Sequence, residues 1–200
     1  MWPWEHAIVG YLAYSLVCHA FFRASPGGLE AFAVVAASVM PDIIDKPLSW
    51  QFGLFDAGYA LGHSIFFAVP FTLLVGALAR SVGRTRAGVA FGLGYLLHPP
   101  SDVLDTLVRE GIFLWRLAFW PVVPVPASDP STGFLAQFAY YFDRYWTDLL
   151  AGDISTYLWV QFGLAGCALL VWLYDGAPVL RETVLGVKRL FVGSARGGRG

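Results

Sequence analysis

The sequence has few charged residues, and this deficit narrows the class of protein. Charged side chains make up 14% of the 200 residues, against about a quarter in average soluble domains. Hydrophobic residues make up 57%, so the chain is too apolar to be disordered. Its 22 glycines follow no regular period, which excludes a collagen-like fibre. Together with a mean hydropathy of +0.60, these figures indicate an integral membrane protein.

Two further shortages exclude other functions. With a formal net charge of −1, the chain lacks the excess of basic residues that binds nucleic acid. It has only two cysteines, Cys18 and Cys167, which lie in apolar stretches without the spacing of a zinc-binding motif. We therefore expect both thiols to pack as small hydrophobic groups, and we predict no disulfide framework.

Five apolar stretches are candidate membrane helices. They cover residues 7–22, 29–44, 59–79, 87–97 and 156–174. A bilayer core takes about 20 helical residues, so the second and fourth stretches are short. No Lys or Arg precedes the first stretch, which favours a retained helix over a signal peptide. The sequence thus predicts an all-α, multi-pass transmembrane helical bundle with about five crossings.

The remaining segments complete the predicted architecture. Residues 103–125 mix Arg109, Glu110 and Arg116 with Leu, Phe and Trp, which favours an amphipathic or re-entrant helix. We interpret residues 126–155 as a polar, aromatic and acidic loop. Residues 1–180 then form one membrane-embedded domain, and residues 181–200 form a basic tail that frays.

The distribution of charge predicts how this bundle is oriented. If the N-terminus lies outside and the chain crosses five times, nine of the 13 Lys and Arg residues lie on the cytoplasmic side. They include Arg23, the loop at 80–86 and the tail. The same arrangement places 11 of the 14 acidic residues outside. We therefore expect a multi-pass protein of the cell membrane with a cytoplasmic C-terminus.

Ionisable residues at membrane depth mark the candidate functional site, because they are costly unless they pair, bind an ion or face water. Four clusters qualify: Glu5 with His6, Asp42 with Asp45, His63 alone, and His98 with Asp102 and Asp105. Five crossings would place all four on the outer side, where they can converge. His98 and Asp102 share a helix face if the chain stays helical through Pro99 and Pro100, which prolines in a first turn would permit.

Imidazoles and carboxylates are the ligands of hydrolytic metal sites, so this set predicts a divalent metal, most simply Zn, with Mn or Fe as alternatives. The expected ligands are His6, Asp42, Asp45, His63, His98 and Asp102. Asp45 and Asp105 are also candidates for proton transfer. Alternative roles remain open, since Asp42 could cap a helix and Asp45 could pair with Lys46. His19 has no acidic neighbour in sequence, and we interpret it as structural.

The same residues carry a resemblance to a known family. Its motifs here are Trp2-Pro3-Trp4-Glu5-His6, Pro41-Asp42-Ile43-Ile44-Asp45-Lys46, Gly62-His63-Ser64 and His98 followed by Asp102. Over about residues 1–105 the chain resembles the membrane-bound metal-dependent hydrolases, also called LexA-binding, inner-membrane-associated hydrolases. Its excess of Arg over Lys and its acidic outer loops are similar to haloarchaeal members. The resemblance implies a metal-dependent hydrolase.

A more distant similarity links the order of these residues to the zinc-dependent phospholipase C and P1 nuclease group. It implies phosphodiester cleavage, with Asp42 or Asp45, His63, His98 and Asp102 on one metal and His6 near a second. The chain departs from that group because no His follows His98 and because Trp2 is not its first residue. A three-metal site is therefore not expected.

These observations predict a membrane-embedded hydrolase that cleaves an ester or a phosphodiester, of a small molecule or a lipid-like substrate, with a metal-activated water. Two alternatives use the same residues. In one, the His/Asp cluster carries an ion or a proton through a transporter with interrupted helices. In the other, a structural metal holds together a membrane scaffold without enzymatic activity.

Overall fold

The computed structural model describes residues 1–125, 133–151 and 156–197, and this part of the chain contains helices and no strands. Its α-helices are α1 (Pro3–Val17), α2 (Gly28–Trp50), α3 (Ile65–Ser81), α4 (Thr85–Glu110), α5 (Gly133–Leu150), α6 (Thr156–Tyr174) and α7 (Leu180–Gly197). A π-helical turn, η1 (Cys18–Phe22), extends α1, and a 3-10 turn, η2 (Trp115–Ala118), follows α4. The all-α prediction is confirmed for these residues.

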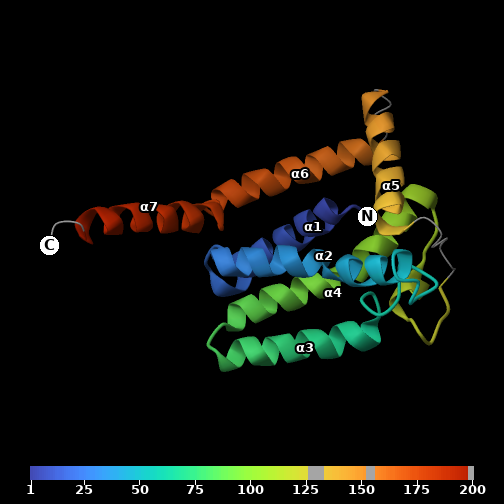
Figure 1. Ribbon diagram of the computed structural model, residues 1–200, viewed down its shortest axis with the longest axis horizontal. Helices are drawn as coiled ribbons and strands as arrows, with labels where there is room; N and C mark the ends of the chain where they lie inside the picture. The colour runs from blue at the N-terminus through green and yellow to red at the C-terminus, as the bar shows by residue number, and fades with distance from the viewer. Residues whose placement is uncertain (126–132, 152–155, 198–200) are drawn as a thin grey trace.

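The first four helices form an up-and-down bundle (Figure 1). Helix α4 packs against α1, α2 and α3, and α6 lies along α1. Because successive helices reverse direction, the start of α1, the end of α2, the start of α3 and the end of α4 meet at one end of the bundle. The basic residues between α1 and α2 and between α3 and α4 lie at the opposite end. The alternation places the predicted site residues together.

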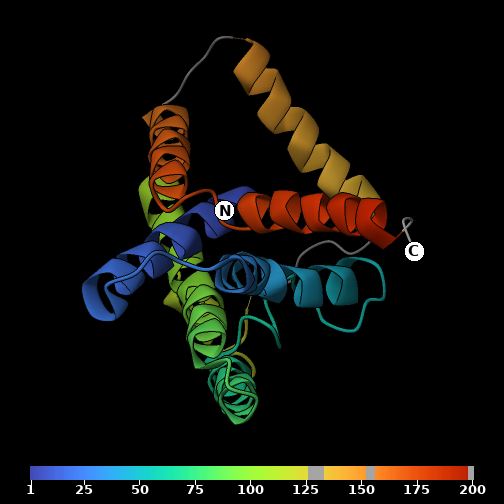
Figure 2. The same ribbon diagram turned by 90° about the vertical axis from the view of Figure 1, so that its left-hand side faces the viewer.

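The two most amphipathic helices do not follow the bundle axis. Figure 1 shows α5 across the bundle end that carries the N-terminus, and Figure 2 shows α7 leaving the bundle obliquely. The aromatic rings of α5 contact Trp2 and Trp50, with Trp2 5.3 Å from Tyr145 and Trp50 6.0 Å from Phe134 between ring centroids. Helix α5 therefore covers the end where the predicted site residues meet.

One helix of the described residues is long and apolar enough to cross a bilayer, namely α6 over Tyr157–Tyr174, with mean hydropathy 1.5. Only 11% of that window is buried inside the protein. Helix α3 is apolar but has 17 residues. The prediction of five crossings is therefore supported clearly at one helix and stays a prediction at the others.

Several predicted boundaries are wrong. Helix α4 ends at Gly111, whose φ of 70° is a left-handed cap, so residues 103–125 do not form a single amphipathic helix. Residues 133–150 form α5 where we expected a loop, and residues 180–197 form α7 where we expected a frayed tail. Helix α3 starts only at Ile65, because the Ser64 hydroxyl accepts the Phe66 backbone N–H as a helix cap.

Helices α2 and α4 both run beyond the apolar stretches predicted at 29–44 and 87–97, and prolines lie inside both helices. Pro99 and Pro100 lie inside α4 rather than in its first turn, and they have no N–H for the carbonyls of Tyr95 and Leu96. Tertiary hydrogen bonds of side chains hold the turn before the two prolines: Tyr95 donates its hydroxyl to the Gly62 carbonyl (2.9 Å), and His98 bonds to the Ser38 carbonyl of α2. The condition for His98 and Asp102 to share a face is thus met.

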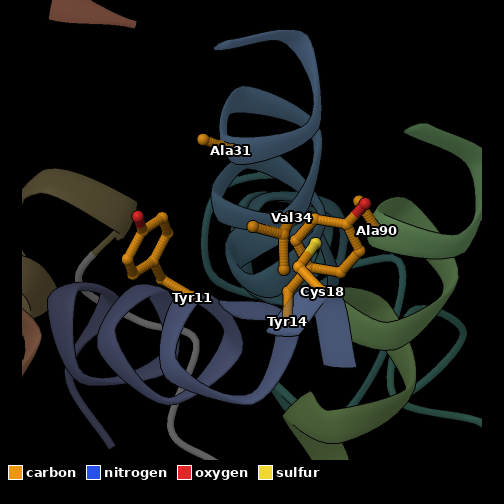
Figure 3. Close-up of a cluster of buried hydrophobic side chains, with 6 residues drawn as sticks. All are labelled: Tyr11, Tyr14, Cys18, Ala31, Val34 and Ala90. Carbon is orange, nitrogen blue, oxygen red and sulfur yellow. The ribbon is translucent and has the colours of Figure 1, made fainter. Parts of the chain in front are cut away.

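Small residues let α1, α2 and α4 approach closely. A Cβ on Gly10 of α1 would lie 2.0 Å from the Ser38 hydroxyl, and one on Gly94 of α4 would lie 2.4 Å from the Val34 carbonyl oxygen. Such contacts are typical of helix pairs in membranes, where close packing replaces the hydrophobic drive for association. Figure 3 shows Tyr14 and Val34 in the core cluster beside this crossing.

Candidate metal centre

Four buried side chains converge at the covered end of the bundle. They are Asp42 on α2, His63 in the turn before α3, and His98 and Asp102 on α4. One ligand atom from each lies within 4.8 Å of the others. Four of the polar residues predicted at membrane depth therefore form one compact group, which could hold a metal ion.

Hydrogen bonds fix which nitrogen of each imidazole faces the centre. His63 Nδ1 lies 2.7 Å from Asp45 Oδ2, and His98 Nδ1 lies 2.6 Å from the Ser38 carbonyl oxygen. Both partners are acceptors only, so each Nδ1 carries the hydrogen and each Nε2 of the neutral ring keeps a lone pair. These two Nε2 atoms face each other at 3.0 Å. Two lone pairs at this distance repel unless a proton or a metal ion lies between them.

Two carboxylate oxygens complete the set. Asp42 Oδ1 lies 3.4 Å from His63 Nε2 and 3.6 Å from His98 Nε2. Asp102 Oδ2 lies 3.5 Å and 3.3 Å from the same two atoms. Ligands at about 2.1 Å from a tetrahedral metal are separated by about 3.4 Å, so these four separations have the size that tetrahedral coordination requires.

The hydrogen bonding of these oxygens is incomplete. Asp42 Oδ1 and Asp102 Oδ2 are buried and have no hydrogen-bond partner among the described residues. Buried polar atoms in folded proteins are nearly always satisfied, so two such oxygens beside two imidazole lone pairs form a group that could bind a cation. The donor set, two imidazole nitrogens and two carboxylate oxygens, suits a divalent ion such as Zn.

Asp45 lies behind His63 and does not face the other three side chains. Its carboxylate accepts the backbone N–H groups of Ala60 (2.7 Å), Gly62 (2.7 Å) and His63 (3.1 Å), besides His63 Nδ1. The structure therefore places Asp45 where it orients the imidazole and holds the turn before α3. A carboxylate in this relation to a histidine is typical of the partner shell around a metal site.

His6 and Asp105 lie beside the group of four. The His6 ring stacks on the His98 ring, with centroids 3.7 Å apart, and His6 Nε2 is 3.2 Å from Asp102 Oδ1. Neither nitrogen of His6 makes a hydrogen bond to a described residue. Asp105, one turn beyond Asp102, is half-buried and lies 3.5 Å from Arg109.

Two cations approach the outer sides of the carboxylates. Lys46 Nζ lies 2.7 Å from Asp42 Oδ2, and the Met1 amine lies 2.9 Å from Asp102 Oδ1 and 3.3 Å from Asp105 Oδ2. Burial favours the neutral amine, but the carboxylates of Asp102 and Asp105 outweigh it and raise the pKa of the Met1 amine. Each aspartate thus keeps its second oxygen for the centre of the group.

Sequence reasoning missed two residues that build this site. Ser38 lies one helical turn before Asp42 and supplies the carbonyl that orients His98. Tyr59 lies four residues before His63, and its ring meets the His63 ring edge-on, with centroids 4.7 Å apart. Spacing of one turn from a predicted ligand was the available signal for Ser38; no pattern in the sequence singled out Tyr59.

Comparison with protein families shows which family the chain is similar to. A family model described as YdjM inner membrane protein matches residues 1–179. No curated protein and no solved structure matches the chain. The matched range contains all four side chains of the candidate centre.

Proposed function

Since the chain belongs to the YdjM inner membrane protein family, we propose that it is a membrane-embedded, metal-dependent hydrolase. Asp42, His63, His98 and Asp102 would hold one divalent metal ion, zinc in the simplest case. The substrate would be an ester or a phosphodiester, and a lipid-like compound is the natural choice for a site within a membrane protein.

One observation carries the metal part of this proposal. The Nε2 atoms of His63 and His98 face each other at 3.0 Å while both Nδ1 atoms bond to acceptors. Asp42 Oδ1 and Asp102 Oδ2 beside them have no hydrogen-bond partner within the described part of the chain. A divalent cation satisfies all four atoms at once and balances the two negative charges, whereas a proton satisfies only part of the set.

The hydrolytic part rests on the type of ligand. A divalent ion held by the four side chains would supply Lewis acidity, and a water that it took as an additional, fifth ligand would have its pKa lowered to about 7. Asp45 holds His63 in place, so we assign it an orienting role instead of the ligand and proton-transfer roles expected from the sequence.

We assign proton transfer to His6. It is buried against His98, and both of its ring nitrogens are free of hydrogen bonds to described residues. An imidazole in this position can accept a proton at Nε2, close to Asp102, and return it to a leaving group. Asp105 is farther along α4 and is paired with Arg109, which favours a supporting role.

The test is the metal content of detergent-purified protein, measured by elemental mass spectrometry. We expect about one ion per chain in the wild type, and its loss in His63→Ala and in His98→Ala. His19→Ala is the matched control, because it removes an imidazole in η1 that is not part of the group of four. Circular dichroism establishes that each variant is folded. A wild type without metal after reloading contradicts the proposal.

Hydrolysis needs a separate measurement. The loaded wild type should cleave a chromogenic phosphodiester or a lipid ester, and the activity should disappear with a chelator and return with the metal. Bound metal without activity on either class would leave a structural metal and refute the hydrolase assignment.

A further inference from the structure

A small cavity lies beside the candidate metal centre. Its volume is about 180 Å³, and it opens between the turn before α3 and the segment that follows η2. Its walls include Phe55, Asp56, Tyr59 and Trp120, together with small and proline side chains. Sites for drug-sized ligands measure about 300 Å³ or more, so this cavity has the size for a headgroup rather than a whole ligand.

The cavity shares its wall with the metal centre. Tyr59 lines the cavity, and its ring contacts that of His63 at 4.7 Å between centroids. Ala60, also in the wall, donates its backbone N–H to Asp45. A group bound in the cavity would therefore lie one side chain away from a ligand of the metal.

Three aromatic residues belong to the lining of this cavity. Phe55 and Trp120 meet edge-to-face at 5.3 Å between centroids, and Tyr59 lies on the side of His63. The Ser64 hydroxyl donates to the Trp120 carbonyl at 2.5 Å, which ties the Trp120 segment to the start of α3. Faces of Trp, Tyr and Phe attract cations through the ring quadrupole, most strongly at desolvated sites.

The charged residues around the cavity also favour a cation. Asp56 lies at the rim, is exposed, and makes no ion pair with a described residue. No Lys or Arg belongs to the lining. Three rings and an unpaired carboxylate around a small space are the elements from which proteins build sites for ammonium groups.

We propose that this cavity binds an organic ammonium group. If the chain is a hydrolase as proposed above, its substrate is an ester or phosphodiester of an amino alcohol, with the ammonium group in the cavity and the scissile bond toward His63. That second statement rests on the proposed function, but the binding of the ammonium group does not require a metal.

The experiment measures binding of tetramethylammonium to the full-length, detergent-purified protein by saturation-transfer NMR on its methyl signal. Neopentyl alcohol is the matched probe, because it has a similar shape and no charge, and empty micelles report partitioning into detergent. We expect saturable binding of tetramethylammonium alone. Trp120→Leu and Asp56→Asn should each weaken it by roughly tenfold.

Two controls separate this proposal from the hydrolase assignment. Phe52→Leu changes an exposed aromatic residue of the same loop that does not line the cavity, and it should leave binding unchanged. His98→Ala should retain binding while losing the metal. Equal binding of the two probes, or unchanged binding in both cavity variants, overturns the ammonium site. Retained binding without any metal in the wild type refutes only the hydrolase.

Discussion

Hydrogen bonds from outside the group of four decide what the two imidazoles can do. Asp45 and the Ser38 carbonyl each take the Nδ1 hydrogen of one ring, and this directs both Nε2 lone pairs to the same point. Asp45 in turn is held by three backbone N–H groups of the turn before α3. The chemistry of the centre thus depends on residues that do not face it.

Asp45→Asn tests this dependence, because it keeps the shape of the side chain and removes its charge. We expect the affinity for the metal to fall by about 10- to 100-fold, since the His63 ring loses its charged partner. A competition titration against a chromogenic chelator measures the affinity. Asp143→Asn on the exposed side of α5 makes the same change away from the centre and should bind as the wild type. Unchanged affinity in Asp45→Asn would contradict the orienting role.

Among the helices, the crossing of α2 and α4 determines where the ligands stand. Ser38 and Asp42 belong to α2, His98 and Asp102 to α4, and the two backbones approach closely at Gly94. A side chain at that position would push the helices apart and move the Ser38 carbonyl away from His98.

Gly94→Ala should therefore destabilise the protein by about 1–3 kcal/mol, as overpacking does, and should reduce its metal occupancy. The matched control is Gly92→Ala on the same helix, where a new Cβ would meet only Thr72 Cβ at 4.0 Å. Because alanine favours helix over glycine, this control should be neutral or slightly stabilising. Thermal unfolding in detergent with metal analysis measures both effects. Equal behaviour of the two variants would show that the close approach is unimportant.

Polar contacts at both ends hold α6 against α1. At its start, Tyr157 and Gln161 donate to Glu5. After its end, the buried Asp175 accepts from Tyr11 and Ser15 and pairs with His19. His19 therefore has an acidic partner, which its sequence neighbours did not reveal. Because lipid solvates apolar side chains as well as another helix does, such polar contacts carry much of the association.

Asp175→Asn should weaken the docking of α6 by about 1.5–3 kcal/mol, since three hydrogen bonds lose their charged acceptor. Limited proteolysis of the connection between α6 and α7 should become faster, while metal content stays at the wild-type level. The control is Glu182→Gln, which alters an exposed carboxylate just beyond that connection. Proteolysis at the wild-type rate in Asp175→Asn would contradict the role of the contacts.

Over the whole molecule, the two ends of the bundle differ in chemistry. One end carries the candidate metal centre, the cavity and the aromatic helix α5, and the other carries Arg23, Arg80, Arg84 and Arg86. Positive residues are retained on the cytoplasmic side of membranes. We therefore predict that the metal centre faces outward.

Single cysteines test this orientation in a Cys167→Ser background, where the remaining Cys18 is buried. A membrane-impermeant maleimide should label Leu54→Cys, in the loop before the cavity, in intact cells. Val82→Cys, between α3 and α4, should react only after permeabilisation. Val187→Cys on α7 should behave like Val82→Cys if the chain crosses five times. The opposite pattern at Leu54 and Val82 would invert the topology, and outward labelling of Val187 would require an even number of crossings.

The local sequence determined the helical class and most of the site. Low charge and long apolar stretches predict a membrane helix bundle, because helices satisfy their own backbone hydrogen bonds in lipid. Few ionisable residues interrupt those stretches, so these residues mark the candidate site. The helices that alternate in direction then require Asp42, His63, His98 and Asp102 to lie at one end. For that reason the group of four could be predicted without coordinates.

Tertiary contacts decided the rest, because each depends on a partner far along the chain. Pro99 and Pro100 lie inside α4, and Tyr95 and His98 bond the turn before them to other segments. We expected Asp45 to be a metal ligand, but it bonds to His63 Nδ1 and to three backbone N–H groups of the turn before α3. Periodicity reports which face a residue occupies along its own helix, whereas such partners are set by how the helices cross.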